Sequence, residues 1–350
     1  MNSIFECPPF ALFALQKRAA VLLLFGIVGV LVLGGCSGKY EIQAEQMTEA
    51  QAGEAKEEVA RKEKPQALPR EEKEAEPGTV EADWTGYFEG LNGAAVLYDA
   101  SAREYQIFNS ALAVTRRSPC STFKIISSLI ALENGILDPE DSVRPWSGEV
   151  FWNENWNRDI DFEEAFRTSC VWYFRELIDE IGQERMREGL DKLSYGNCDI
   201  SDWEGRQNTN NNNRALTGFW LESSLAISPQ EQVQVLERIF GTDSAYSKKT
   251  QDELRKVMLT EEDGSGIPVY GKTGMGKAQG VVVDAWFAGF AEIEGENVYF
   301  CVYLGRTDGE NVSSTAAKEI AIRLINDYDS GLRNESERER REYGTVDSNI

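Results

Sequence analysis

A serine and a lysine three residues apart are the side chains of this sequence best suited to chemistry. They lie in the stretch Ser121-Thr122-Phe123-Lys124, which has the form Ser-x-x-Lys. The 350-residue chain contains no histidine, which excludes a Ser-His-Asp triad and a histidine-liganded metal site. A serine nucleophile here needs another base, and an amine one helical turn away has the right spacing. The sequence therefore favours nucleophilic catalysis by Ser121 with Lys124 as its partner.

Two further short motifs hold residues that could complete such a site. Ser169-Cys170-Val171 comes just before a predicted helix, and Lys272-Thr273-Gly274 lies on a predicted strand. Each motif also has an ordinary structural explanation. Ser121 could cap a helix beside a surface lysine, and a lysine on an edge strand is usually solvated. A single tryptophan such as Trp220 is most simply explained as an aromatic residue of the hydrophobic core. The three motifs in this order indicate a catalytic site more strongly than any one of them does alone.

The elements predicted around the motifs are strands at both ends of the domain and helices between them. Period-two runs predict the early strands, and three β-rich runs with short connections predict an antiparallel meander. Apolar spacing, capping residues and a Pro at a first helical position predict the helices. The strands are expected at 94–98, 105–108, 269–273, 281–293 and 298–304, and the helices at 121–133, from Asp161, at 171–181, from Ser228 and at 314–327. The fold class is therefore α+β, an antiparallel sheet flanked by helices with an inserted helical subdomain.

The N-terminal residues predict export. Lys17 and Arg18 precede an apolar run that is short for a membrane span, which is typical of a secretory signal at 1–35. The run ends in Leu33-Gly34-Gly35-Cys36, which resembles a bacterial lipobox. The resemblance implies cleavage before Cys36 and lipid on its thiol, giving stable anchoring by two acyl chains. An uncleaved anchor helix is the alternative. In either case we expect an exported protein, in the first case a cell-membrane lipoprotein facing the extracytoplasmic side.

The remaining sequence divides by composition. Residues 36–82 are polar and charged and predict a lipid-anchored, disordered tether. The folded catalytic domain is expected at 83–332, followed by a charged tail at 333–350. The net charge of −23 argues against nucleic acid as a partner. The cysteines of the domain are expected to be buried free thiols rather than disulfides. They are Cys120, Cys170, Cys198 and Cys301.

Together, the motifs resemble the site of the serine penicillin-recognising enzymes. The closer resemblance is to class D (OXA-type) β-lactamases and the related penicillin-sensor domains of the BlaR type. It extends over about 84–328. Ser-x-Val is the specific feature, since class A enzymes have Ser-Asp-Asn there and transpeptidases Ser-x-Asn. The stretches that carry it are 88–101, 118–124, 157–173, Tyr195-Gly196-Asn197 and 219–228.

The valine of Ser-x-Val bears on how Lys124 could act as a base. A free lysine with a pKa near 10.4 is neutral in only about one molecule in 2,500 at pH 7. A dry, apolar pocket disfavours the ammonium form and can lower that pKa by several units. The resemblance implies that the neutral amine then adds CO2 to become N6-carboxylysine. Val171 would keep water away, and the Trp220 indole would donate a hydrogen bond to the carbamate.

The resemblance also implies roles for the other residues in hydrolysis of β-lactams through a serine acyl-enzyme. Backbone N–H groups of Ser121 and Met275 would form the oxyanion hole. Ser169 would relay a proton to the leaving nitrogen, helped by Lys272. Residues expected to bind the substrate are Thr273, Gly274 and Arg306. No metal and no cofactor other than CO2 or bicarbonate is expected.

One part of the pattern does not match. The family binds the substrate carboxylate with an arginine after the strand that follows Lys-Thr-Gly, and Arg306 and Lys318 are the nearest candidates. Neither aligns cleanly with that position. Three other functions also fit the site: a penicillin sensor that stays acylated, a transpeptidase, and a non-catalytic binding protein. The sensor in its full form would need membrane helices and a protease domain.

Overall fold

A six-stranded sheet forms the centre of the structure, a computed structural model that describes residues 76–260, 266–307 and 312–343. The strand order is β1-β3-β2-β6-β5-β4, and all neighbours are antiparallel except β1 and β3. The predicted meander is β4, β5 and β6. The strands are β1 (Gly78–Glu81), β2 (Gly93–Asp99), β3 (Glu104–Phe108), β4 (Val269–Ala278), β5 (Val281–Ile293) and β6 (Glu296–Gly305).

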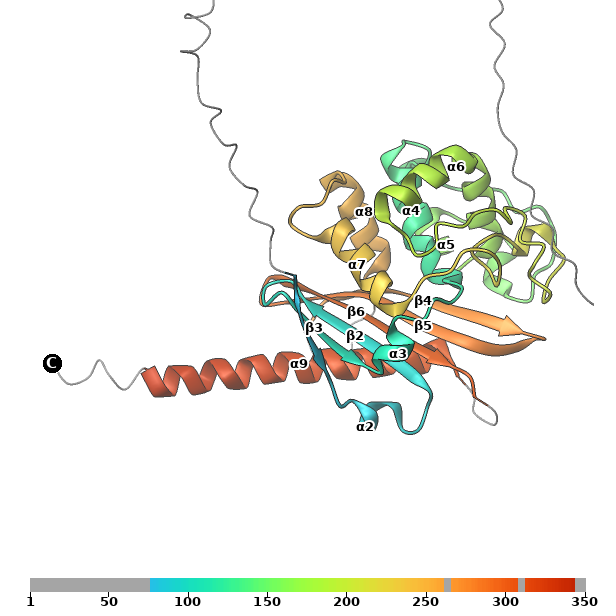
Figure 1. Ribbon diagram of the computed structural model, residues 1–350. Helices are drawn as coiled ribbons and strands as arrows, with labels where there is room; N and C mark the ends of the chain where they lie inside the picture. Colours follow the sequence, from blue (N-terminus) through green and yellow to red (C-terminus); the bar gives the residue numbers. More distant parts are fainter. Residues whose placement is uncertain (1–75, 261–265, 308–311, 344–350) are drawn as a thin grey trace, which may run out of the picture. The chain divides into compact units, whose positions relative to one another are not determined.

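Helices cover both faces of the sheet (Figure 1). One face carries α9 and the short α2, and the other carries the helices inserted between β3 and β4. The predicted α+β class with a helical insertion is confirmed. The helices are α2 (Thr85–Phe88), α3 (Ser110–Ala113), α4 (Lys124–Glu133), α5 (Phe162–Arg167), α6 (Val171–Leu193), α7 (Pro229–Phe240), α8 (Lys248–Met258) and α9 (Ser314–Tyr343).

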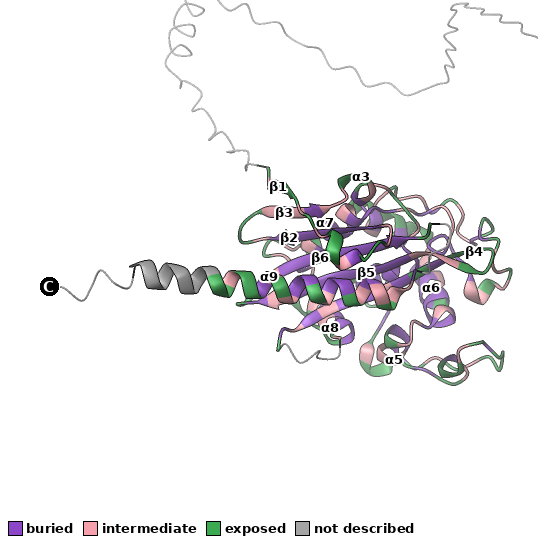
Figure 2. Ribbon diagram, turned by 90° about the horizontal axis from the view of Figure 1, so that it is seen from below, coloured by how far each residue is buried: buried purple, intermediate pink, exposed green. Residues whose placement is uncertain are grey.

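Two hydrophobic cores lie on the two sides of the sheet. Strand β2 is buried along its whole length and serves both. Val96 and Tyr98 face the core under the inserted helices, whereas Ala95 and Leu97 face the core under α9. Figure 2 shows the buried strands behind α9, whose outer surface is exposed. This double burial explains why the sequence of β2 is a continuous apolar run rather than an alternating one.

Several helix boundaries follow the predicted caps. The Ser228 side chain and Glu231 form the predicted capping box at the start of α7, with Pro229 at the first helical position. Asp161 caps α5 by accepting a hydrogen bond from the Glu164 N–H. The predicted end of α6 at residue 181 marks a real interruption. Gly182 there has a φ of 77°, after which the helix resumes to Leu193.

Two predicted boundaries differ from the structure. Residues 78–81 form β1, although they belong to the segment expected to be a disordered tether. All four residues are exposed and the strand pairs with β3 through its backbone, so no apolar pattern in the sequence predicts it. Helix α9 continues to Tyr343, well past the predicted residue 327, because its distal turns are charged and have no core-facing periodicity to reveal them.

The cysteines of the domain are free, as predicted, with Cys120, Cys170 and Cys301 buried and Cys198 partly exposed. In the described ranges, no helix is both long and apolar enough to cross a bilayer. The predicted signal peptide, Cys36 and residues 36–75 of the predicted tether lie outside these ranges.

Candidate active site

Ser121 and Lys124 meet at the start of a helix, as their spacing predicts. Residues Cys120–Phe123 form a 3₁₀ turn that continues directly into α4 at Lys124. The Lys124 amine donates a hydrogen bond of 3.1 Å to the Ser121 hydroxyl. N–H groups in the first turn of a helix have no acceptor within that helix and favour developing negative charge. The serine is therefore placed both beside an amine and at a site that can stabilise an oxyanion.

Lys124 lies in a dry environment. Its side chain is only 1% exposed, and its amine lies 5.1 Å from the centre of the Phe174 ring. Burial lowers the pKa of Lys124 from 10.5 to about 8, with smaller opposing effects from the Cys170 and Cys120 thiols. At pH 7 about one molecule in ten then carries the neutral amine, about 250-fold more than for a free lysine.

Ser169 and Lys272 form a second hydroxyl–amine pair. Ser169 occupies the tight turn between α5 and α6 with a φ of 60°, a left-handed conformation that costs a non-glycine residue about 1–3 kcal/mol. The Lys272 amine donates to the Ser169 hydroxyl at 3.1 Å and to the Thr273 carbonyl at 3.0 Å. Burial, and then the charge on Lys124, hold the pKa of Lys272 well below its ordinary value. The charge on Lys124 therefore affects the protonation of Lys272.

Glycines let β4 approach the nucleophile. A Cβ atom on Gly274 would lie 3.1 Å from the Pro119 carbonyl oxygen and from the Thr122 methyl group. A Cβ on Gly276 would lie 3.2 Å from the Cys120 sulfur. Such distances are tighter than ordinary side-chain contacts. The glycine of Lys-Thr-Gly is therefore required by the close packing of β4 on the turn that holds Ser121.

The Met275 N–H points to the outer edge of β4. The strand is the last in the sheet, so only β5 pairs with it. The Pro268 carbonyl accepts from an N–H of β5 at 3.0 Å, whereas the Val269 carbonyl accepts from Thr260, outside the sheet, at 2.9 Å. Backbone groups alternate in direction along a strand. Met275 is six residues beyond Val269 and precedes the register shift after Gly276, so its N–H faces outward. This is the direction that the predicted oxyanion hole requires.

A cavity of about 410 Å³ opens in front of these groups. Its other walls include Trp152, Trp156, Glu222 and Lys277. Lys124, Lys272 and Trp220 are almost completely buried behind the cavity surface. The predicted site residues that line it are Ser121, Ser169, Val171, Thr273, Gly274 and Met275.

The comparisons with known proteins agree with this geometry. A family model for the penicillin binding protein transpeptidase domain matches residues 91–326, more than half of the sequence. The chain belongs to this family. The protein resembles the probable β-lactamase YbxI of Bacillus subtilis at 33% identity over 241 residues, which cover 69% of this chain and 82% of that one. The predicted relationship is thereby confirmed at the level of the family.

Two further relatives define its position in the family. Regulatory protein BlaR1 of Bacillus licheniformis is 32% identical over 254 residues, covering 71% of this chain. The match covers 39% of BlaR1, so the chain spans about two fifths of that relative's length. A class D β-lactamase crystal structure from Bacillus subtilis superposes with a TM-score of 0.61 at 32% identity, covering 71% of this chain and 95% of the other. Class D β-lactamases and BlaR-type proteins are the relatives that the Ser-x-Val motif predicted.

Trp220 and Val171 lie beside residues that adjoin or contact Lys124. Trp220 is fully buried, and its ring lies 6.1 Å from that of Phe123, the residue before Lys124. Val171 opens α6 between Cys170, whose thiol interacts with Lys124, and Phe174, whose ring lies near the amine. The roles that the resemblance implies for both residues toward a carbamate stay predictions.

Arg306 is the predicted site residue that the structure does not bring to the cavity. It lies at the exposed end of β6, where its N–H donates to the Val283 carbonyl at 2.8 Å, and it is not part of the cavity wall. Lys318 on α9 is also absent from that wall. Lys277 does line the cavity, beside the exposed Trp152. A cation near the substrate is therefore available from β4 rather than from the end of β6.

Glu222 is a site residue that the motif analysis missed. Its carboxylate accepts hydrogen bonds from the Lys277 N–H at 2.9 Å and from the Asn208 amide at 2.7 Å, and its own N–H donates to the Ser118 hydroxyl at 2.9 Å. Burial raises the pKa of this carboxyl group. Glu222 thus ties the asparagine-rich loop, the end of β4 and the segment before Ser121 together. Its position in the sequence, two residues after Trp220, was the one feature that could have pointed to it.

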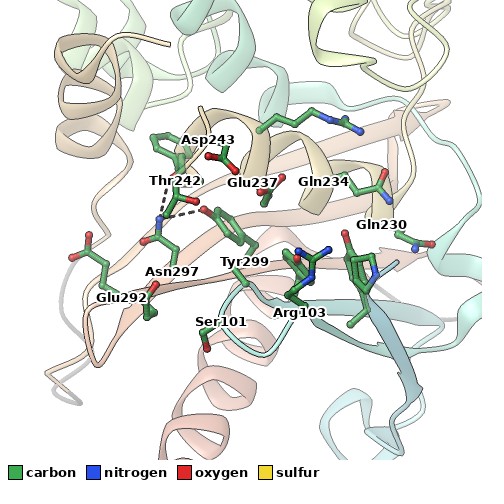
Figure 3. A pocket seen from close by; sticks show the side chains of 18 of the residues that line it. Ser101, Arg103, Gln230, Gln234, Glu237, Thr242, Asp243, Glu292, Asn297 and Tyr299 are labelled. Atoms are coloured by element: carbon green, nitrogen blue, oxygen red, sulfur yellow. Dashed lines mark hydrogen bonds between the residues drawn. The ribbon is translucent and has the colours of Figure 1, made fainter. Parts of the chain in front are cut away.

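A larger cavity, of about 730 Å³, lies at the other end of the sheet (Figure 3). Residues of α7 such as Gln234 and Glu237 form one side, and Tyr299 and Asn297 lie opposite them. None of the predicted site residues lines this cavity. Size alone therefore does not locate the chemistry of this protein. Within the described residues, no cluster of three or more acidic or thiol side chains is arranged to hold a metal ion.

Proposed function

We propose that the protein hydrolyses β-lactams through an acyl-enzyme on Ser121, with carboxylated Lys124 as the general base. The observation that carries the proposal is the buried Lys124 amine, 3.1 Å from the Ser121 hydroxyl and with its pKa lowered to about 8. Family membership and the β-lactamase relatives support the choice of substrate. The roles below are those that the resemblance implies, and the positions of the side chains support them.

The surroundings of Lys124 suit addition of CO2. Only a neutral amine can attack CO2, and it loses one proton as the nitrogen–carbon bond forms. Burial makes the neutral form about 250 times more abundant at pH 7 than in a free lysine. The carbamate would supply an anionic oxygen as a base next to Ser121. The chain's part is to keep the amine neutral and dry, which Val171 and Phe174 support, and to offer the Trp220 indole as a donor.

Acylation uses the two hydroxyl–amine pairs in turn. The Ser121 oxygen forms a bond to the β-lactam carbonyl carbon while its proton passes to the Lys124 side chain. The N–H groups of Ser121 and Met275 stabilise the negative charge on the carbonyl oxygen. The carbon–nitrogen bond of the ring then breaks. The leaving nitrogen takes a proton from the Ser169 hydroxyl, which recovers one from Lys272 at 3.1 Å.

Deacylation repeats the chemistry with water. Before this step Lys124 loses to solvent the proton that it took from Ser121, and Lys272 regains one from solvent. The Lys124 side chain then accepts a proton from a water molecule, whose oxygen attacks the ester carbonyl carbon, and the proton passes to the Ser121 oxygen as the ester bond breaks. Thr273 offers a hydroxyl to the substrate carboxylate, and Lys272 attracts it electrostatically. Arg306 stays a proposed contributor on the resemblance alone, whereas Lys277 has the support of its place in the cavity wall.

The test is nitrocefin hydrolysis by the purified protein with and without added bicarbonate. We expect steady turnover that rises with bicarbonate, and its loss in a Lys124→Ala variant. Lys318→Ala, a lysine substitution on α9 away from the cavity, is the matched control and should hydrolyse at the parent rate. Parent-rate turnover by Lys124→Ala would contradict the role given to this residue.

A penicillin sensor that is acylated and turns over slowly is the second candidate. The similarity to BlaR1 over 254 residues favours it. The same assay separates the two, because a sensor gives one nitrocefin equivalent per protein and then stops. A stoichiometric burst without steady turnover, with acyl-Ser121 found by mass spectrometry, would replace the hydrolase proposal with the sensor.

We also propose that the protein is an exported, lipid-anchored protein of the cell membrane. The support is the signal-like segment followed by Leu33-Gly34-Gly35-Cys36. Metabolic labelling with a radioactive fatty acid should mark the parent protein. It should not mark a Cys36→Ser variant, and equal labelling of both would refute the anchor.

A further inference from the structure

Arg175 is a buried arginine behind the site that no step of the mechanism uses. It lies on α6, one helical turn after Val171, and is only 1% exposed. Its guanidinium lies 5.5 Å from the centre of the Trp203 ring and 5.6 Å from that of Trp220. Burying a charge costs several kcal/mol before its partners compensate. A charge placed against Trp220 therefore needs either a complete set of partners or a function.

The partners of Arg175 hold its guanidinium in one orientation. One terminal nitrogen donates to the Trp203 carbonyl at 2.8 Å, and the other two donors bind the two oxygens of Asp179. Asp179 also accepts from Arg214 at 2.7 Å and from the Trp203 indole at 3.3 Å. Partial burial alone would raise the pKa of Asp179, but hydrogen bonds from Arg214 and Arg175 hold it below its ordinary value. Asp179 is thus a fixed anion, and the plane of Arg175 is fixed with it.

Trp220 is confined by the groups around it. The Phe123 ring packs against its indole at a centroid distance of 6.1 Å. A Cβ atom on Gly218 would overlap the six-membered part of the indole, so glycine there allows the ring its position. The backbone carbonyl of Trp220 accepts a hydrogen bond from the Cys120 N–H at 3.0 Å, which fixes the Trp220 backbone beside the Ser121 turn. The Arg175 guanidinium supplies a further contact to the ring.

We propose that Arg175 is a positioning residue that fixes the Trp220 indole and thereby favours carboxylation of Lys124. This inference rests on the proposed carboxylation. Arg175 acts through Trp220, because its guanidinium lies 5.6 Å from the centre of that ring. Without the guanidinium, the indole gains freedom to tilt, and its N–H is less often directed at the carbamate. Around metal ligands, loss of an outer supporting partner typically costs about 10- to 100-fold in metal affinity or activity, and we use the lower end of that range for this contact.

The test compares Arg175→Met with Arg255→Met. Arg255 is a matched control, since it is also paired with a carboxylate, that of Glu292, and packed on aromatic rings. Arg255 does not line the active-site cavity. Carbon-13 NMR with labelled bicarbonate measures the carboxylated fraction of Lys124 without substrate, and Lys124→Ala identifies the signal. We expect Arg175→Met to need about tenfold more bicarbonate for half-carboxylation, and Arg255→Met to match the parent.

The outcomes separate a role of Arg175 in positioning Trp220 from a role in folding stability alone. If Arg175→Met only lowers the melting temperature while its bicarbonate midpoint equals that of the parent, the inference is wrong and the proposed function stands. If the parent itself shows no carbamate signal, carboxylation fails and this inference fails with it. Arg175→Lys keeps the charge but cannot bind Asp179 and Trp203 together, so its midpoint should lie between parent and Arg175→Met. A parent-like midpoint in Arg175→Lys would show that charge alone suffices and would overturn the positioning role.

Discussion

Val171→Asn tests whether dryness makes Lys124 a base. Val171 opens α6 next to Cys170, and one turn before Phe174, whose ring lies 5.1 Å from the Lys124 amine. An asparagine side chain places an amide oxygen in this apolar shell. The amide can accept a hydrogen bond from the ammonium form of Lys124 and so stabilises the form that cannot attack CO2.

The size of the effect follows from the pKa of Lys124. Lowering it from 10.5 to about 8 corresponds to about 3 kcal/mol against the ammonium form. A hydrogen bond to a charged group restores about 1.5–3 kcal/mol. The pKa of Lys124 should therefore rise by about one to two units. At pH 7 the neutral fraction should fall from about one in ten to between about one in a hundred and one in a thousand.

The assay titrates nitrocefin turnover with bicarbonate at a series of pH values. In the parent, the bicarbonate concentration that gives half the maximal rate should fall as pH rises. It should level off above about pH 8, where the amine is neutral. In Val171→Asn the levelling should move up by about one to two pH units. Val171→Ile keeps the shell apolar and should level off where the parent does. The same levelling point in Val171→Asn and the parent would refute the argument from dryness.

Further predictions concern stability, packing and substrate binding. In bicarbonate-free buffer, Lys124→Met should raise the free energy of unfolding by up to about 3 kcal/mol at pH 7, because the parent buries an ammonium there. Between about pH 8 and 10.5 only the unfolded parent keeps that proton, so the stability of the parent rises with pH. The difference in unfolding free energy between parent and variant should therefore close over this range. Urea melts that show the same difference at every pH would contradict this. Gly274→Ala should push β4 off the Ser121 turn and lower kcat about tenfold or more, whereas Gly86→Ala, with open space around it, should not. Lys277→Ala should raise KM for penicillins about fivefold and Arg306→Ala should leave it nearly unchanged; the reverse order would return the carboxylate site to β6.

The sequence predicted those elements of the fold that bury a patterned apolar face. The meander of β4 to β6, the helix after Ser121 and the capped start of α7 all carry such patterns and were predicted correctly. Strand β1 could not be found this way, since its side chains are exposed and its pairing uses only the backbone. The interruption of α6 was visible as Gly182, but not the continuation beyond it, because a second helical stretch after a kink depends on tertiary packing.

The site was predictable where chemistry demands particular residue types at fixed spacing. Ser121 and Lys124 are neighbours because i, i+3 residues share a helix face. Ser169 and Lys272 are 103 residues apart, and their 3.1 Å contact was inferred only from the resemblance. Glu222 and Arg175 were missed, because their roles come from burial and partners that no local pattern shows. Arg306 illustrates the converse, since a suitable residue type in roughly the right place lies outside the cavity.

The two buried lysines are coupled, and carboxylation would reverse the sign of that coupling. In the unmodified protein, burial and then the positive charge on Lys124 hold the pKa of Lys272 well below its ordinary value. A carbamate replaces that positive charge by a negative one, so the second cause would then raise the pKa of Lys272. Lys272 would hold the proton that Ser169 relays to the leaving nitrogen only when Lys124 is ready to take one from Ser121. Carboxylation of Lys124 would thus prepare both the base that takes a proton from Ser121 and the acid that supplies one through Ser169. Both proton transfers would depend on the dry pocket that permits carboxylation.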